Sequence, residues 1–142
     1  VGMPGWKCQP ILDRMASSAR AKDIRYLRYV SDEQLRALYT RTELFVFPSL
    51  YEGFGFPPLE AMACGAPVLS AATGALPEVL GGAATIASGF DPDQWAELAT
   101  SRLGDRSSAE KGKSQAAKYS WPKTALDTWN VYRKLSCLAL LR

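Results

Sequence analysis

Two short runs of almost entirely apolar residues flank a helical segment in the middle of the chain. The runs are ELFVFP (43–48) and APVLSA (66–71), and the segment between them, PLEAMACG, ends at Gly65, a residue type typical of the position after a helix. Strands that are apolar on both faces are typical of a parallel sheet covered on both sides. The pattern of strand, helix and strand therefore predicts an α/β fold with a parallel sheet.

The rest of the chain continues this alternation. Ser31 and Gln34 form a capping-box pattern, which predicts a helix over 31–41. We expect a Rossmann-like parallel sheet with flanking helices in a doubly wound arrangement, a helical tail at the C-terminus, and one domain over residues 1–142. The further segments are strands at 23–30 and 83–88 and helices at 9–19, 75–82, 91–103, 107–119 and 122–139.

The first residues, VGMPGWK (1–7), are typical of the end of a strand followed by a loop. No strand precedes them in this sequence, although a parallel sheet of this kind normally contains more strands than the two central runs. We therefore expect the chain to be an N-terminally incomplete part of a larger protein.

Composition excludes several classes of function. With 142 residues and 47% apolar content the chain can bury a core, and its net charge of +3 comes without the basic clusters that bind nucleic acid. Three scattered cysteines, no CxxC spacing and no histidine argue against a zinc site or a disulfide framework. The longest apolar run is far shorter than the roughly 20 residues of a membrane span. We expect a cytoplasmic protein without a transmembrane segment, with peripheral attachment at the inner membrane face as a second option.

The stretch YEGFGFPPLEAM (51–62) carries two glutamates around a Gly-x-Gly turn. Ligands of open parallel sheets bind at the carboxyl ends of the strands, where loops lead into helix N-termini that attract anions. We expect a helix that begins near Pro58, with Glu60 in its first turn. A carboxylate can accept hydrogen bonds from two hydroxyls, so Glu60 suits a ribose, while Glu52 suits a sugar hydroxyl or positive charge on a reacting carbon. The pattern favours a sugar nucleotide.

A structural explanation exists for each of these features alone. Glutamate is favoured in a helix's first turn by the dipole, and Gly-x-Gly is common in turns. The dinucleotide fingerprint G-x-G-x-x-G also fails, since Pro58 stands at its third position. This failure disfavours a nicotinamide-dependent oxidoreductase.

The whole stretch VFPSLYEGFGFPPLEAMACGAPVLS resembles the donor-site signature of the retaining family 4 glycosyltransferases, which have the two-domain GT-B fold. The two glutamates, separated by seven residues, match the motif of this family at Glu52 and Glu60. The resemblance extends to RYVSDEQLRALY, LPEVLGG and YSWPKTALDTWNVYRKL, and so covers nearly the whole chain. It implies the C-terminal, donor-binding domain of a hexosyltransferase of carbohydrate biosynthesis, with a nucleoside diphosphate sugar as donor substrate and no metal or other cofactor.

The resemblance also implies roles for single residues. Glu52 would be the catalytic residue beside the donor sugar, and Glu60 would hold the ribose hydroxyls. The acceptor would bind mainly to an N-terminal domain that this chain lacks. The arginine and lysine with which the family binds the diphosphate would lie upstream of this chain, in an earlier loop of the C-terminal domain. The other donor-binding residues would be the backbone of Gly53, Phe54 and Gly55 at the diphosphate and sugar, Val30 near the base, and Gly74 in a second loop.

Three alternatives remain open, of which a nicotinamide-dependent oxidoreductase is disfavoured by the failed fingerprint. A truncated, non-catalytic nucleotide-sugar-binding or interaction module would share the sheet and the loops, and a GT-B sugar-nucleotide epimerase would need acid and base groups that the sequence does not show.

Other candidate residues have simpler structural explanations. The Asp-x-Asp of DPDQW is explained by Asp91 as the N-cap of a helix with Pro92 in its first turn, so it indicates no metal site. Cys64 has no histidine to activate it as a nucleophile and is expected to pack in a helix. Trp129 and Tyr132 are expected to form core or domain contacts.

Overall fold

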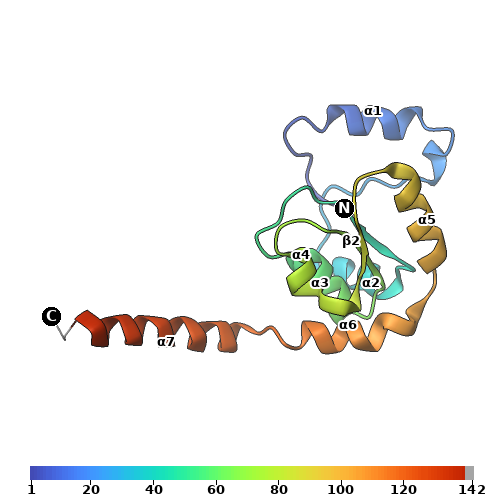
Figure 1. Cartoon of the computed structure of the whole chain (residues 1–142). Helices are drawn as coiled ribbons and strands as arrows, with labels where there is room; N and C mark the ends of the chain where they lie inside the picture. The colour runs from blue at the N-terminus through green and yellow to red at the C-terminus, as the bar shows by residue number, and fades with distance from the viewer. Residues whose placement is uncertain (140–142) are drawn as a thin grey trace. The chain divides into compact units, whose positions relative to one another are not determined.

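The computed structural model describes residues 1–139, with side chains described through residue 135 (Figure 1). Packing divides the chain into two compact units, of which unit 1 is Val1–Leu38 and unit 2 begins at Tyr39. The expectation of one domain over residues 1–142 stays a prediction.

Unit 1 contains helix α1 (Gln9–Ser17), the short 3₁₀ helix η1 (Ala21–Asp23) and most of α2 (Asp32–Arg41). The strand predicted over 23–30 is wrong, and so is the strand end predicted over 1–7. Backbone pairing between these segments is confined to Gly2, whose N–H donates to the carbonyls of Leu27 at 2.9 Å and Arg28 at 3.2 Å. Leu27 is 38% exposed, so the segment lacks both the ladder of hydrogen bonds and the buried face that stabilise a strand.

Helix α2 begins as the sequence predicts. Ser31 N donates to Gln34 Oε1 at 2.9 Å, and Gln34 N donates to Ser31 Oγ at 3.3 Å. These reciprocal bonds satisfy two backbone N–H groups that have no partner inside the helix, and they fix where the chain enters it.

A parallel three-stranded sheet organises unit 2. Its strands are β1 (Phe45–Phe47), β2 (Val68–Ala71) and β3 (Thr85–Ala87), in the order β1-β2-β3. β2 is buried along its whole length, as expected for an apolar central strand, whereas Val46 of β1 is 44% exposed. The predicted parallel sheet is confirmed, and its consecutive strand order means that the carboxyl ends of β1 and β2 are adjacent at one edge.

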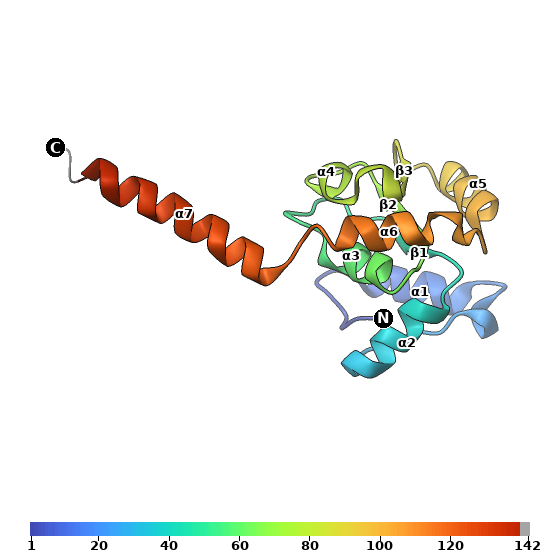
Figure 2. The same ribbon diagram turned by 90° about the horizontal axis from the view of Figure 1, so that it is seen from below.

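The core of unit 2 lies between β2 and helix α3 (Phe56–Ala63), and helix α6 (Ala109–Ala116) packs against α3. These helices lie side by side, as Figures 1 and 2 both show. Their close approach requires Gly112, because a Cβ at this position would lie 3.3 Å from Met62 Cγ. Met62 and Leu69 are fully buried, and burial of such side chains stabilises a fold by roughly 1.5–3 kcal/mol each.

The remaining helices of unit 2 agree with the sequence within a few residues, apart from short 3₁₀ turns at their ends. Asp91 accepts a hydrogen bond from Asp93 N at 3.2 Å, which confirms it as an N-cap. The further elements are α4 (Leu76–Leu80), η2 (Gly81–Ala83), α5 (Pro92–Arg102), η3 (Arg106–Ser108) and α7 (Trp121–Ala139).

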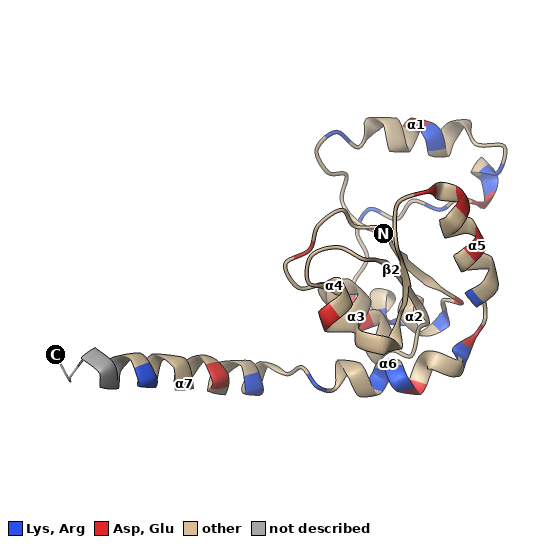
Figure 3. Ribbon diagram, in the orientation of Figure 1, with Lys and Arg blue, Asp and Glu red and all other residues tan. Residues whose placement is uncertain are grey.

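Helix α7 carries both signs of charge along its length (Figure 3), including an ion pair of 2.6 Å between Lys123 and Asp127. Trp129 and Tyr132, on the same helix, are 62% and 60% exposed. They do not belong to the core of this unit, so the prediction that they form core contacts is wrong, and the prediction of domain contacts stays a prediction. The pattern of apolar residues in α7 indicated an amphipathic helix but could not identify what packs against it.

Candidate functional site

Two loops meet at the carboxyl edge of the sheet. The first loop, residues 48–55, follows β1, and the second loop, residues 72–75, follows β2. Thr73 Oγ1 donates to the carbonyl of Ser49 at 2.8 Å, and Ala75 N donates to the carbonyl of Glu52 at 3.1 Å. These two bonds join loops more than twenty residues apart in sequence, at the edge where parallel α/β sheets bind ligands.

Gly74 allows this close approach. Its φ of +53° lies in the left-handed region, and a Cβ on this residue would lie 2.2 Å from the carbonyl oxygen of Glu52. No side chain fits at that separation, so glycine is required both by conformation and by space. The structure thus brings two of the predicted site residues, Glu52 and Gly74, into direct backbone contact.

The side chain of Glu52 is half-buried and has a partner within its own loop. Ser49 Oγ donates to Glu52 Oε1 at 2.8 Å, which restricts the rotamers of a side chain that is otherwise flexible. Sequence reasoning missed Ser49. A serine three residues before a loop carboxylate could have indicated this contact, because local side-chain hydrogen bonds of serine are common in loops.

Helix α3 begins two residues earlier than predicted. Its first residue is Phe56 and its N-cap is Gly55, so the expectation that the helix begins near Pro58 with Glu60 in the first turn is wrong. Proline is accepted in a first turn because N–H groups there have no partner in the helix. Both prolines, Pro57 and Pro58, fall in that turn, and Glu60 lies in the second.

The early start also changes which groups could bind an anion. Pro57 and Pro58 have no N–H, and Leu59 N already donates to the carbonyl of Gly55 at 3.4 Å. The N-terminus of α3 therefore offers fewer free backbone N–H groups to an anion than an ordinary helix N-terminus does. The donors that remain at this position are the amide of Phe56 and those of the preceding loop.

The Gly-x-Gly turn consists of two glycines with different constraints. Gly55 has φ +104°, and a Cβ there would lie 2.5 Å from Leu76 Cδ2, whereas a Cβ on Gly53 would meet nothing within 4 Å. The ring of Phe54, between them, packs against Phe56 with centroids 4.9 Å apart. Gly55 is therefore packed against the core, whereas the backbone of Gly53 has free space beside it.

Glu60 is exposed and lies beside an aromatic hollow. Tyr39 OH donates to Glu60 Oε2 at 3.4 Å. The hollow has a volume of about 410 Å³, and among the described residues that line it Glu60 alone is charged; the others include Phe54, Phe56 and Trp121. The carboxylate therefore has a fixed hydrogen-bond partner and still borders open space.

The hydroxyl of Tyr39 is an uncharged donor over the physiological range. Burial raises its pKa to about 12, and the negative charge of Glu60 acts in the same direction. Sequence reasoning did not identify Tyr39 as a partner of Glu60, because nothing in the spacing of residues 39 and 60 indicates a contact between their side chains.

Val30, the predicted contact of the base, precedes α2 in unit 1. Its proximity to a ligand stays a prediction, as do the ligand contacts of Gly53, Phe54 and Gly55.

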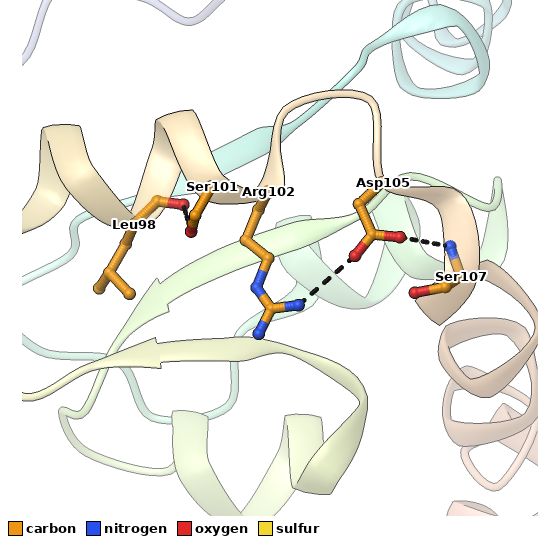
Figure 4. A network of polar contacts seen from close by, with 5 residues as sticks. All are labelled: Leu98, Ser101, Arg102, Asp105 and Ser107. Atoms are coloured by element: carbon orange, nitrogen blue, oxygen red, sulfur yellow. Dashed lines mark hydrogen bonds and ion pairs between the residues drawn. The ribbon is translucent and has the colours of Figure 1, made fainter.

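A second cavity, of about 220 Å³, lies at the opposite edge of the sheet, near the amino ends of the strands. Two of its three charged side chains contact each other. Arg102 Nη1 lies 3.4 Å from Asp105 Oδ2, and Asp105 Oδ1 accepts a bond from Ser107 N at 2.9 Å (Figure 4). The hydrogen bonds from Ser107, with a smaller contribution from Arg102, lower the pKa of Asp105. This arrangement caps η3 and leads into α6.

Among residues 1–135, whose side chains the structure describes, no group of three histidine, cysteine or acidic side chains is placed to hold a metal ion. The expectation that no metal takes part stays a prediction. No helix within residues 1–139 is long and apolar enough to cross a membrane.

The fold and the two joined loops define an α/β protein with a candidate ligand site at the carboxyl edge of its sheet. Residues 9–119 match the family described as glycosyl transferases group 1. The chain belongs to this family, and the resemblance found in its sequence is confirmed.

Three related proteins agree with this assignment. The chain is 38% identical to O-antigen chain mannosyltransferase B of Escherichia coli, over 94% of the chain and 36% of that protein. It is 40% identical to MMP alpha-(1->4)-mannosyltransferase of Mycolicibacterium hassiacum, over 74% of the chain and 28% of that protein. Among solved structures it resembles sucrose-phosphate synthase of Thermosynechococcus elongatus, with a TM-score of 0.81, 25% identity, and coverage of 96% of this chain and 37% of the other.

The structural neighbour confirms the α/β fold of the GT-B class. The chain spans roughly a third of the length of these relatives, 28% to 37%. The relatives are named as glycosyltransferases or as a synthase, which gives no support to the oxidoreductase alternative.

Proposed function

We propose that the full-length protein is a retaining glycosyltransferase and that this chain supplies its donor site. The donor is a nucleoside diphosphate sugar. Glu52 lies beside the sugar, Glu60 holds the ribose hydroxyls, and the backbone of Gly53 to Gly55 binds the diphosphate. The observation that carries the proposal is the junction of the two loops through Glu52 and Gly74, in a chain that belongs to this family.

The geometry supports these roles in the following way. Transfer breaks the bond between the anomeric carbon and the diphosphate oxygen, the oxygen of an acceptor hydroxyl bonds to the same carbon, and the hydroxyl proton passes to the leaving diphosphate. Positive charge grows on the sugar and negative charge on the leaving diphosphate, so fixed charges and dipoles are the groups that lower the barrier. A carboxylate held by Ser49 at 2.8 Å suits the first task, and loop amides suit the second.

Glu60 has the properties that a ribose site needs. It is exposed, it borders the aromatic hollow, and one of its oxygens is held by Tyr39. Its carboxylate can accept hydrogen bonds from two adjacent hydroxyls. The names of two relatives contain mannosyltransferase, so mannose is the sugar that we propose to test first.

The test is sugar transfer by the full-length protein, supplied with GDP- and UDP-linked sugars and a set of glycan acceptors. We expect release of nucleoside diphosphate and a product whose anomeric configuration, measured by NMR, equals that of the donor. Glu52→Ala should lower turnover by about 100-fold or more, the magnitude of a lost electrostatic contact to the transition state.

Glu110→Ala is the matched control, because Glu110 is an exposed glutamate on α6 paired with Lys113 at 2.8 Å. Its turnover should equal that of the wild type. Equal turnover of Glu52→Ala and wild type would refute the role of Glu52, and an inverted product would refute retention.

A further inference from the structure

We propose that Tyr39 is a positioning residue for Glu60, holding the carboxylate in the orientation that receives the ribose hydroxyls. The inference rests on the proposed function of Glu60. It is carried by the hydrogen bond from Tyr39 OH to Glu60 Oε2 at 3.4 Å and by the packing that fixes the tyrosine ring.

The ring of Tyr39 is buried and packs against a neighbouring aromatic ring. Tyr39 lies in the last turn of α2 and is only 7% exposed. Its ring meets that of Phe45 on β1 edge to face, with centroids 5.3 Å apart and planes at 82°. A buried ring in this arrangement has little rotational freedom, so the hydroxyl is a donor with a fixed position.

Glu60, in contrast, is an exposed side chain with several rotatable bonds. Ordering a free glutamate on binding costs up to about 2 kcal/mol of side-chain entropy. A donor that holds Oε2 in the unbound protein reduces this cost, and Oε1 keeps its capacity to accept hydrogen bonds from a ligand.

The donor role of Tyr39 does not change over the pH range in which a sugar nucleotide is stable. Burial and the nearby negative charge of Glu60 raise the pKa of the Tyr39 phenol to about 12, so the group remains protonated.

The experiment measures how strongly the full-length protein prefers a ribose. Dissociation constants are determined by calorimetry for GDP and UDP and for their 2′,3′-dideoxy forms, which lack both ribose hydroxyls. In the wild type the ribose form should bind more tightly. Tyr39→Phe keeps the ring and removes the hydroxyl, and it should lower the ribose preference by about 2- to 10-fold, as expected for one net hydrogen bond.

A double substitution separates positioning from general destabilisation. In the Glu60→Ala background, Tyr39→Phe should leave the ribose preference unchanged, because the group that it positions is absent. The matched control is Thr100→Val, which removes a hydroxyl that donates to the carbonyl of Ala96 at 2.7 Å on α5, a helix that does not line the hollow beside Glu60. This control should change thermal stability without changing the ribose preference.

The outcomes distinguish the two levels of the proposal. If Glu60→Ala removes the ribose preference while Tyr39→Phe leaves it intact, the positioning role is refuted and the ribose site stands. If Glu60→Ala itself leaves the preference intact, or if the wild type has none, the ribose role of Glu60 fails and the positioning role fails with it.

Discussion

The contact between Gly74 and the backbone of Glu52 makes a quantitative prediction for Gly74→Ala. A Cβ at residue 74 would lie 2.2 Å from Glu52 O and 3.0 Å from Glu52 N. Real Cβ atoms essentially never come within 3.0 Å of such an atom, so the first loop must move by roughly 1 Å. Such a displacement of a catalytic group can lower a rate by about 100-fold.

The effect on stability has two parts. A non-glycine residue in the left-handed region costs about 1–2 kcal/mol. Displacement of the first loop breaks the bond of 3.1 Å from Ala75 N to Glu52 O, which contributes about 0.5–1.5 kcal/mol net. With residual steric strain, we expect Gly74→Ala to lower the free energy of unfolding by about 2–4 kcal/mol.

Urea unfolding of the chain measures the stability term, and turnover of the full-length protein measures the catalytic one. Gly104→Ala is the matched control, because Gly104 has φ +72° and a Cβ there would meet nothing within 4 Å. It should cost only the conformational term of about 1–2 kcal/mol and leave turnover unchanged. If Gly74→Ala matches Gly104→Ala in both measurements, the junction of the loops does not position Glu52.

Three further predictions concern other parts of unit 2. Ser49→Ala removes the donor to Glu52 Oε1 and should lower turnover by about 3- to 10-fold, in a kinetic assay that shows little change in nucleotide affinity. Met62→Ala should lower the free energy of unfolding by about 2–5 kcal/mol, measured by urea unfolding, because Met62 is fully buried. The pKa of Tyr39 is raised to about 12 in the folded state, so the folded protein holds this proton more tightly than the unfolded chain does. The resulting contribution to the free energy of unfolding is fully present below pH 10 and is lost as the pH rises toward 12. Stability should therefore fall less steeply over this interval in Tyr39→Phe, and equal slopes would contradict the burial of this phenol.

Local signals in the sequence predicted the regular elements of unit 2 and the start of α2. The apolar runs around Val46 and Leu69 became adjacent parallel strands, and the capping pattern of Ser31 and Gln34 is present in full. These features depend on neighbouring residues and on hydrophobic periodicity, which a single sequence contains.

Features that depend on distant residues were not predictable in the same way. The residues 23–30 have the composition of a strand but no partner strand, and Glu60 moved into the second turn of α3 because Gly55 caps the helix earlier than expected. The contact between Tyr39 and Glu60 joins residues 21 positions apart in the sequence. Pairing and packing of this kind arise from tertiary structure, which local propensity does not determine.

The central claim is that Glu52 and Glu60 hold two different parts of one donor. The most direct test is calorimetric measurement of the affinity of the full-length protein for a nucleoside diphosphate and for the corresponding sugar nucleotide. The account predicts that Glu60→Ala weakens binding of both ligands, whereas Glu52→Ala leaves the diphosphate affinity unchanged and removes the difference between the two ligands. Unchanged diphosphate affinity in Glu60→Ala, or an unchanged difference in Glu52→Ala, would contradict it.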